Sequence, residues 1–225
     1  MGRVIVLALL ACCGLAAQAA PIIFNTTQFS TDAVASVGAV ADVQSATSPP
    51  DGLPLISGAV ALSGVDFASA AAIADIGLLV AQSEASSTQP TASAVASAMF
   101  TGTFSLASDT KLKFFIDLDD QDFTDAGAFS DASLFLQLKF EGTTYADMLL
   151  TGNDPIFFTV DIPGAGNGVL SLLLASEAGT FGAGNAANFA QAQFLVVPEP
   201  GTLALLLAGV GLLGGVAQRR RCKRP

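Results

Sequence analysis

Short runs of alternating side chains are the feature that most limits what the central part of this chain can fold into. The clearest run is Ser133–Phe140, which places Leu134, Leu136, Leu138 and Phe140 on one face of an extended backbone. Alternation over this length is typical of a strand with one face in a core. The run therefore predicts a β-strand, and a sheet for it to join.

Similar runs recur along the chain and are separated by turn-forming residues. The strand-like runs are Met99–Leu106, Lys111–Leu118, Ile156–Ile162, Val169–Ala175 and Phe189–Val197. Turn signals lie at Ser48–Gly52, Glu141–Gly142, Gly152–Pro155 and Pro163–Gly168. Many short strands with this spacing predict a mainly β fold, an antiparallel β-sandwich or jelly-roll-like body over residues 20–196.

The segment Gly58–Ala98 leaves two alternatives open. Ala68–Val80 is rich in alanine and has the composition of a helix. The neighbouring repeats of serine, threonine and alanine fit long strands with small side chains. We favour strands here, and we expect residues 44–52 to form a surface loop.

Charge and missing residue types exclude several functions for this body. Between Ala20 and Val197 the chain has 18 carboxylates and three lysines, a net charge of 3 − 18 = −15, and it has no cysteine or histidine. Such an acidic surface repels phosphate backbones, which argues against nucleic-acid binding, and it keeps an exported protein soluble. Zinc sites built on Cys or His, and Ser-His or Cys-His catalytic pairs, are excluded.

The N-terminus has the order of parts found in a secretory signal peptide. Arg3 is followed by the apolar run Val4–Ala11, and then by small residues that include Ala17 and Ala19. This A-x-A pattern suits signal peptidase, so residues 1–19 are predicted to form a signal peptide helix that is removed after Ala19. A lipoprotein signal centred on Cys12 is the alternative.

The C-terminus, residues 197–225, has three parts. Val197-Pro198-Glu199-Pro200-Gly201 breaks regular structure, because two prolines cannot lie inside a helix or a central strand. Gly201–Ala217 contains no charged residue, and as a helix it would span about 26 Å, which is short but sufficient for a transmembrane helix. A basic tail follows, with Arg219, Arg220, Arg221, Lys223 and Arg224. Positive residues stay on the cytoplasmic side, so the body is predicted to face outward.

This order of motif, apolar helix and basic cluster resembles the PEP-CTERM sorting signal of Gram-negative bacteria that secrete exopolysaccharide. The resemblance implies that an exosortase recognises Pro198, Glu199 and Pro200 and processes the protein nearby. It also implies passage through the inner membrane, followed by a place at the cell surface or in the extracellular matrix. A plain tail anchor is the alternative.

Aspartates gather after one of the predicted strands. We expect a loop there that contains Asp117, Asp119, Asp120, Asp122, Asp125 and Asp131. Carboxylates at two-residue spacing are ligands that Ca²⁺ can use, and the first four form the candidate site. The glycine that calcium loops carry at their sixth position is absent, so a solvated acidic loop is the simpler interpretation. No other cofactor is predicted.

Together these features predict an exported, non-catalytic surface protein associated with exopolysaccharide or biofilm. Its expected partners are signal peptidase, an exosortase and, in transit, the inner membrane. A carbohydrate- or calcium-binding β-sandwich is the alternative. An extracellular hydrolase lacks candidate residues, since the aromatic platforms that usually hold sugars are scarce and tryptophan is absent.

Overall fold

The computed structural model describes residues 22–88 and 91–198, and this part of the chain is mainly β with no helix. The strands are β1 (Thr26–Val37), β2 (Val40–Thr47), β3 (Leu55–Ser63), β4 (Asp66–Asp75), β5 (Leu78–Ser87), β6 (Ala92–Leu106), β7 (Thr110–Thr124), β8 (Ala128–Phe140), β9 (Thr143–Leu150), β10 (Ile156–Ile162), β11 (Gly166–Thr180) and β12 (Gly184–Pro198). The mainly β prediction is confirmed.

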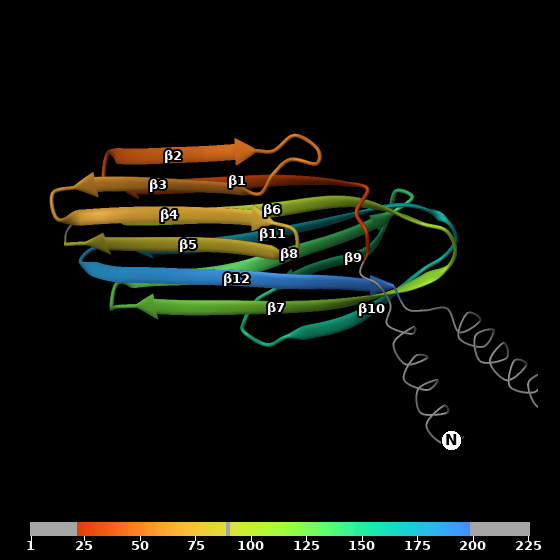
Figure 1. Ribbon diagram of the computed structural model, residues 1–225. Helices are drawn as coiled ribbons and strands as arrows, with labels where there is room; N and C mark the ends of the chain where they lie inside the picture. The colour runs from red at the N-terminus through yellow and green to blue at the C-terminus, as the bar shows by residue number, and fades with distance from the viewer. Residues whose placement is uncertain (1–21, 89–90, 199–225) are drawn as a thin grey trace, which may run out of the picture.

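The strands form two six-stranded antiparallel sheets that pack face to face (Figure 1). The first sheet has the order β2-β1-β6-β11-β8-β9, and the second has the order β10-β7-β12-β5-β4-β3. Most connections pass from one sheet to the other, as between β5 and β6 or between β11 and β12. Residues far apart in sequence therefore meet in one core between the sheets.

The predicted strands all lie within strands of the structure, and most of them are longer than predicted. Ser133–Phe140 forms the second half of β8, and Leu134, Leu136, Leu138 and Phe140 face the core, each no more than 3% exposed. This strand pairs with β11 along nearly its whole length. Alternation identified these strands because their inward faces carry large apolar side chains.

The alanine-rich segment forms strands, as favoured from the sequence. Residues 68–75 belong to β4 and residues 78–80 to β5, with a two-residue turn between them, and alternate side chains of β4 are buried. The buried alanines of this part of the core are Ala68, Ala70, Ala72 and Ala74 in β4, Ala81 and Ala85 in β5, and Ala92, Ala94, Ala96 and Ala98 in β6. Because alanine projects only one carbon, Cα atoms of β4 and β5 come within 8 Å of Cα atoms of β6. Close packing of the two sheets thus outweighs the helical propensity of alanine.

The surface loop expected at residues 44–52 is only partly correct. Residues 44–47 belong to β2, where Gln44 pairs with Ala33 of β1. The connection to β3 begins at Ser48, whose buried Oγ accepts the backbone N–H of Phe29 at 2.9 Å. The strand was missed because β2 is an edge strand with almost no buried face, so its sequence shows no apolar alternation.

The turn predicted at Glu141–Gly142 is confirmed as a two-residue hairpin between β8 and β9. Both residues have positive φ, 47° for Glu141 and 78° for Gly142. Two positive φ values in succession are typical of the type I′ turn, which matches the right-handed twist of the paired strands. The Glu141 carboxylate also accepts the backbone N–H of Asn167 at 2.6 Å, which holds the hairpin against the start of β11.

Candidate functional site

The predicted sorting residues begin at the very end of a central strand. Pro198 is the last residue of β12, where it is half-buried and lies opposite Leu112 of β7. Proline has no backbone N–H, so the ladder of hydrogen bonds cannot continue on that side. The remaining predicted residues, Glu199 and Pro200, the basic tail Arg219, Arg220, Arg221, Lys223 and Arg224, and the signal cleavage residues Ala17 and Ala19, lie outside the described residues.

The start of the described chain lies beside this end of β12. The backbone N–H of Ile22 donates to the carbonyl of Val196 at 2.9 Å. Three residues later, the N–H of Asn25 donates to Thr103 of β6 in the first sheet at 2.6 Å. Between these two bonds the ring of Phe24 packs edge-on against Phe100, with 5.1 Å between the ring centroids. The chain therefore enters and leaves the body at neighbouring points (Figure 1).

The predicted acidic loop is not a loop between residues 117 and 122. Asp117, Asp119, Asp120 and Asp122 all lie within β7, which pairs with β12 from Leu112 to Thr124. Alternation of the strand places Asp117 and Asp119 on the outer face of the second sheet and Asp120 and Asp122 on the other face. Because two of the carboxylates point away from the other two, the four cannot surround one ion. The strand was missed because aspartate is rare in strands and typical of turns.

Asp120 instead ends a chain of hydrogen bonds that crosses the core. Ser83 of β5 lies 2.8 Å from Ser176 of β11, Oγ to Oγ. Ser176 Oγ donates to Asn188 Oδ1 of β12 at 2.8 Å, and Asn188 Nδ2 donates to Asp120 Oδ1 at 2.7 Å. Since the single hydroxyl proton of Ser176 is used toward Asn188, Ser83 must be the donor to Ser176. All three hydrogen bonds run in one direction, toward the carboxylate.

This polar chain was not predicted from the sequence, although the signal was present. Ser83, Ser176 and Asn188 are almost completely buried, at 0%, 1% and 1% exposed, and each interrupts a run of inward-facing apolar residues. Burial raises the pKa of Asp120; the hydrogen bond from Asn188 opposes this shift, and the negative charges of Asp122, Asp131 and Asp119 add to it. A polar residue at an inward position of the alternation needs a buried partner, but the sequence does not tell which one.

Asp42 makes a second structural contact, at the opposite side of the sandwich. It lies on the edge strand β2, and its Oδ2 accepts the backbone N–H of Val60 on the edge strand β3 at 3.1 Å. This hydrogen bond and a second one from Gln44 lower the pKa of Asp42. The carboxylate occupies a free donor of the β3 edge, which is a way of protecting an edge strand from pairing with another chain.

Neither a metal cluster nor a membrane helix is present in residues 22–88 and 91–198. No three Asp, Glu, Cys or His side chains there converge as ligands for one ion. None of the described segments is a helix long and apolar enough to cross a bilayer. The predicted transmembrane helix at 201–217 and the signal peptide helix lie outside the described residues.

Comparison with known proteins gives one informative match. The family model of the PEP-CTERM protein-sorting motif matches residues 196–221. No curated protein matches the chain. Among solved structures, the VP2 subviral particle of infectious bursal disease virus is 10% identical over 83% of this chain and 68% of that chain, with a TM-score of 0.18. The structure of the Gx strain of the same virus has the same identity and coverage, with a TM-score of 0.17. Neither likeness bears on the fold or function of this chain.

The matched residues include the last three of β12 and all of the predicted motif. Such a motif indicates export through the membrane, processing by an exosortase and a place at the cell surface. The chain carries a PEP-CTERM protein-sorting motif at residues 196–221.

Proposed function

We propose that this chain is a non-catalytic component of the exopolysaccharide or biofilm matrix of a Gram-negative bacterium. In this proposal signal peptidase removes residues 1–19, the segment 201–217 holds the protein in the inner membrane, and an exosortase then processes it. The observation that carries the proposal is the sorting motif, which starts inside β12 and so joins the folded body with no linker.

Two features of the body support a structural role. The body contains no histidine or cysteine. The two carboxyls with shifted pKa values, Asp42 and Asp120, both bind groups of the fold itself, a strand edge and a buried amide. Perturbed carboxyls in an enzyme site face an open cleft where a substrate can reach them. Here hydrogen bonds from Val60 and Gln44 account for the lowered pKa of Asp42, and burial within the sandwich accounts for the raised pKa of Asp120.

The strand order supports a jelly-roll topology for the body. Strands β5 to β12 give β10-β7-β12-β5 in one sheet and β6-β11-β8-β9 in the other, the arrangement of two interlocked Greek keys. Strands β1 and β2 widen one sheet beyond β6, and β3 and β4 widen the other beyond β5. The result is a long two-sheet module (Figure 1), which suits a matrix component.

The proposal is tested by intact mass and cell fractionation in a host that carries an exosortase. The protein is compared with a variant carrying Pro198→Ala, Glu199→Ala and Pro200→Ala. The matched control carries Pro49→Ala, Pro50→Ala and Asp154→Ala, which change the same classes of residue at exposed positions of the body. We expect the parent and the control to lose both ends and to leave the inner membrane, while the motif variant keeps its tail. If all three keep residues 201–225 in the membrane, the tail is a plain anchor.

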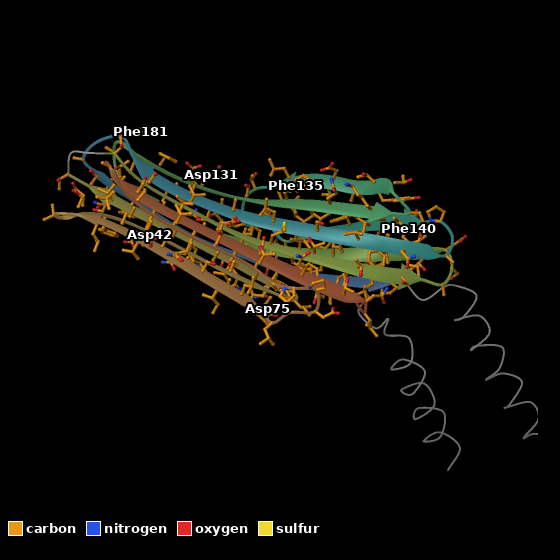
Figure 2. All side chains as sticks on the ribbon, turned by 90° about the horizontal axis from the view of Figure 1, so that it is seen from above. Asp42, Asp75, Asp131, Phe135, Phe140 and Phe181 are labelled. Atoms are coloured by element: carbon orange, nitrogen blue, oxygen red, sulfur yellow. The ribbon has the colours of Figure 1, made fainter. Side chains whose placement is uncertain are left out.

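A carbohydrate-binding body is the second candidate, and exposed aromatic rings favour it. Phe123 and Phe181 are 58% and 75% exposed. Phe123 lies opposite Ala187 near the start of β12, and Phe181 lies at the end of the body away from Pro198 (Figure 2). Apolar ring faces can stack on sugars. Glycan-array binding that is lost when a chelator is added would support a calcium-dependent sugar site. Binding that survives the chelator would support stacking of sugars on the exposed rings alone.

A further inference from the structure

We propose that the outer face of the second sheet, where β12 ends, docks on the surface of a phospholipid bilayer. The docking residues are Phe115, Phe157 and Leu195 with Lys111 and Lys113, named here the exit surface. The inference rests on the proposed function, because it requires the segment 201–217 to hold the protein at the membrane.

The apolar part of the exit surface is a row across three neighbouring strands. Leu195 of β12 lies directly opposite Phe115 of β7, and Phe115 lies directly opposite Phe157 of β10. The two rings are in contact, with 4.9 Å between their centroids. Phe157 is 71% exposed and Leu195 is 46% exposed, so the row is open to solvent although it is built of large apolar side chains. Apolar side chains exposed in this way can enter the boundary between the lipid headgroups and the acyl chains.

The basic part follows in the next two rows, toward the strand ends. Lys113 lies between Val197 and Thr159, and Lys111 lies opposite Asp161, which it contacts at 3.2 Å. Residues 22–198 contain only three lysines, so two of the three lie on this small surface. Aromatic rings beside lysines are the combination that proteins use at a membrane interface, where lysine reaches lipid phosphates.

The remaining charges of this face do not prevent docking. Asp161 is paired with Lys111, and Asp117 lies one row behind Leu195, beside Gln193. Asp119, on the same face, lies one row farther back, beside Gln191. The exit surface is therefore close to neutral, whereas the body between Ala20 and Val197 has a net charge of −15. Negatively charged phospholipids repel an acidic body, and they repel this nearly neutral surface less.

The length of chain beyond β12 brings this surface to the bilayer. Only Glu199 and Pro200 separate Pro198 from the uncharged segment that starts at Gly201. Three extended residues span at most about 10 Å, so the end of β12 stays within roughly that distance of the point where the apolar segment begins. The other end of β12, at Gly184, lies about 46 Å away at ~3.3 Å per residue. The tether thus selects which end of the body meets the lipid.

The absence of tryptophan from this chain provides a direct test. Phe157→Trp introduces the only tryptophan into the exit surface. Phe181→Trp is the matched control: Phe181 is 75% exposed, it also belongs to an aromatic pair, with Phe129, and it lies at the opposite end of the body (Figure 2). Each full-length variant is reconstituted in vesicles of phosphatidylcholine and phosphatidylglycerol, with and without brominated acyl chains that quench tryptophan.

We expect both variants to float with the vesicles, and brominated lipid to quench Phe157→Trp several-fold more than Phe181→Trp. Adding Lys111→Gln and Lys113→Gln to the Phe157→Trp protein should remove the part of the quenching that depends on phosphatidylglycerol. Equal quenching of the two reporters in floated vesicles would overturn the exit surface while leaving membrane attachment intact. Failure to float would overturn membrane attachment by the tail, and the inference with it. If the Phe157→Trp protein dimerises without lipid and its tryptophan emission is then blue-shifted, the exit surface binds a second copy of the chain and the inference is overturned.

Discussion

The hydrogen-bond chain through the core predicts that two nearly identical substitutions have unequal effects on stability. Ser176→Ala removes the central hydroxyl, which both accepts from Ser83 and donates to Asn188. The Ser83 hydroxyl and the Asn188 carbonyl then both lose a partner, at positions that are 0% and 1% exposed. An unsatisfied buried polar group costs roughly 1–3 kcal/mol, so we expect Ser176→Ala to lower the free energy of unfolding by about 2–4 kcal/mol.

Ser83→Ala removes only the first donor of the chain. Ser176 keeps its bond to Asn188, and Asn188 keeps its bond to Asp120. The expected loss is about 0.5–1.5 kcal/mol, the net value of one hydrogen bond. Ser45→Ala, the same change on the exposed face of β2, serves as the control and should stay within about 0.5 kcal/mol of the parent.

The assay is equilibrium unfolding in urea of residues 20–198, followed by far-UV circular dichroism and by the fluorescence of Tyr145, the single tyrosine. If the slope of unfolding free energy against urea concentration is the same in the variants and the parent, the differences in unfolding free energy reflect changes in the folded state. Equal losses for Ser176→Ala and Ser83→Ala, or losses below about 0.5 kcal/mol for both, would refute the directed chain of donors.

Four further outcomes are expected. Gly168→Ala should lower the free energy of unfolding in urea by about 1–3 kcal/mol, because a Cβ there would overlap the ring of Phe104, which is 1% exposed. Burial raises the pKa of Asp120 above its ordinary 3.8, so the folded protein holds this proton more firmly than the unfolded chain, and the free energy of unfolding falls as the pH rises from about 3.8 through the raised pKa. Asp120→Asn should remove this pH dependence. Parallel plots of unfolding free energy against pH for the two proteins would contradict the expectation. Asp42→Ala should speed hydrogen exchange at the Val60 amide and leave amides of central strands unchanged. Calorimetry should detect no calcium binding tighter than about millimolar, because the aspartates of β7 lie on both faces of the strand; a micromolar site would require ligands from elsewhere.

The sequence predicts the strands of this body best where large apolar residues alternate. Leu134, Leu136 and Leu138 identify β8, and Gly142 marks the turn that follows it, although the positive φ of Glu141 is not predictable from its residue type. The alanine strands are harder to predict, because alanine has no strong strand preference of its own and the deciding contribution is the close approach of the second sheet.

The sites depend on contacts between distant residues, and these are hidden in the sequence. Ser83 and Ser176 are 93 positions apart, and Asp120 and Asn188 are 68 apart. The aspartates of β7 were assigned to a loop because their residue type favours turns, but pairing with β12 keeps the segment extended. The sorting motif, in contrast, is read from consecutive residues, so the sequence alone could identify it.

The position of β12 determines how the body responds to mechanical load. The strand is flanked on one side by β5, from Gly184 to Gln193, and on the other by β7, from Ala186 to Pro198. A pull on the tail acts along the strand axis, perpendicular to its inter-strand hydrogen bonds. Both ladders then share the force in shear, and many bonds must break together before the strand slips. The same pull along the edge strand β2 would load a single ladder, the one that it forms with β1. Traction on a protein held by its tail would therefore reach the body along a strand that is paired on both sides.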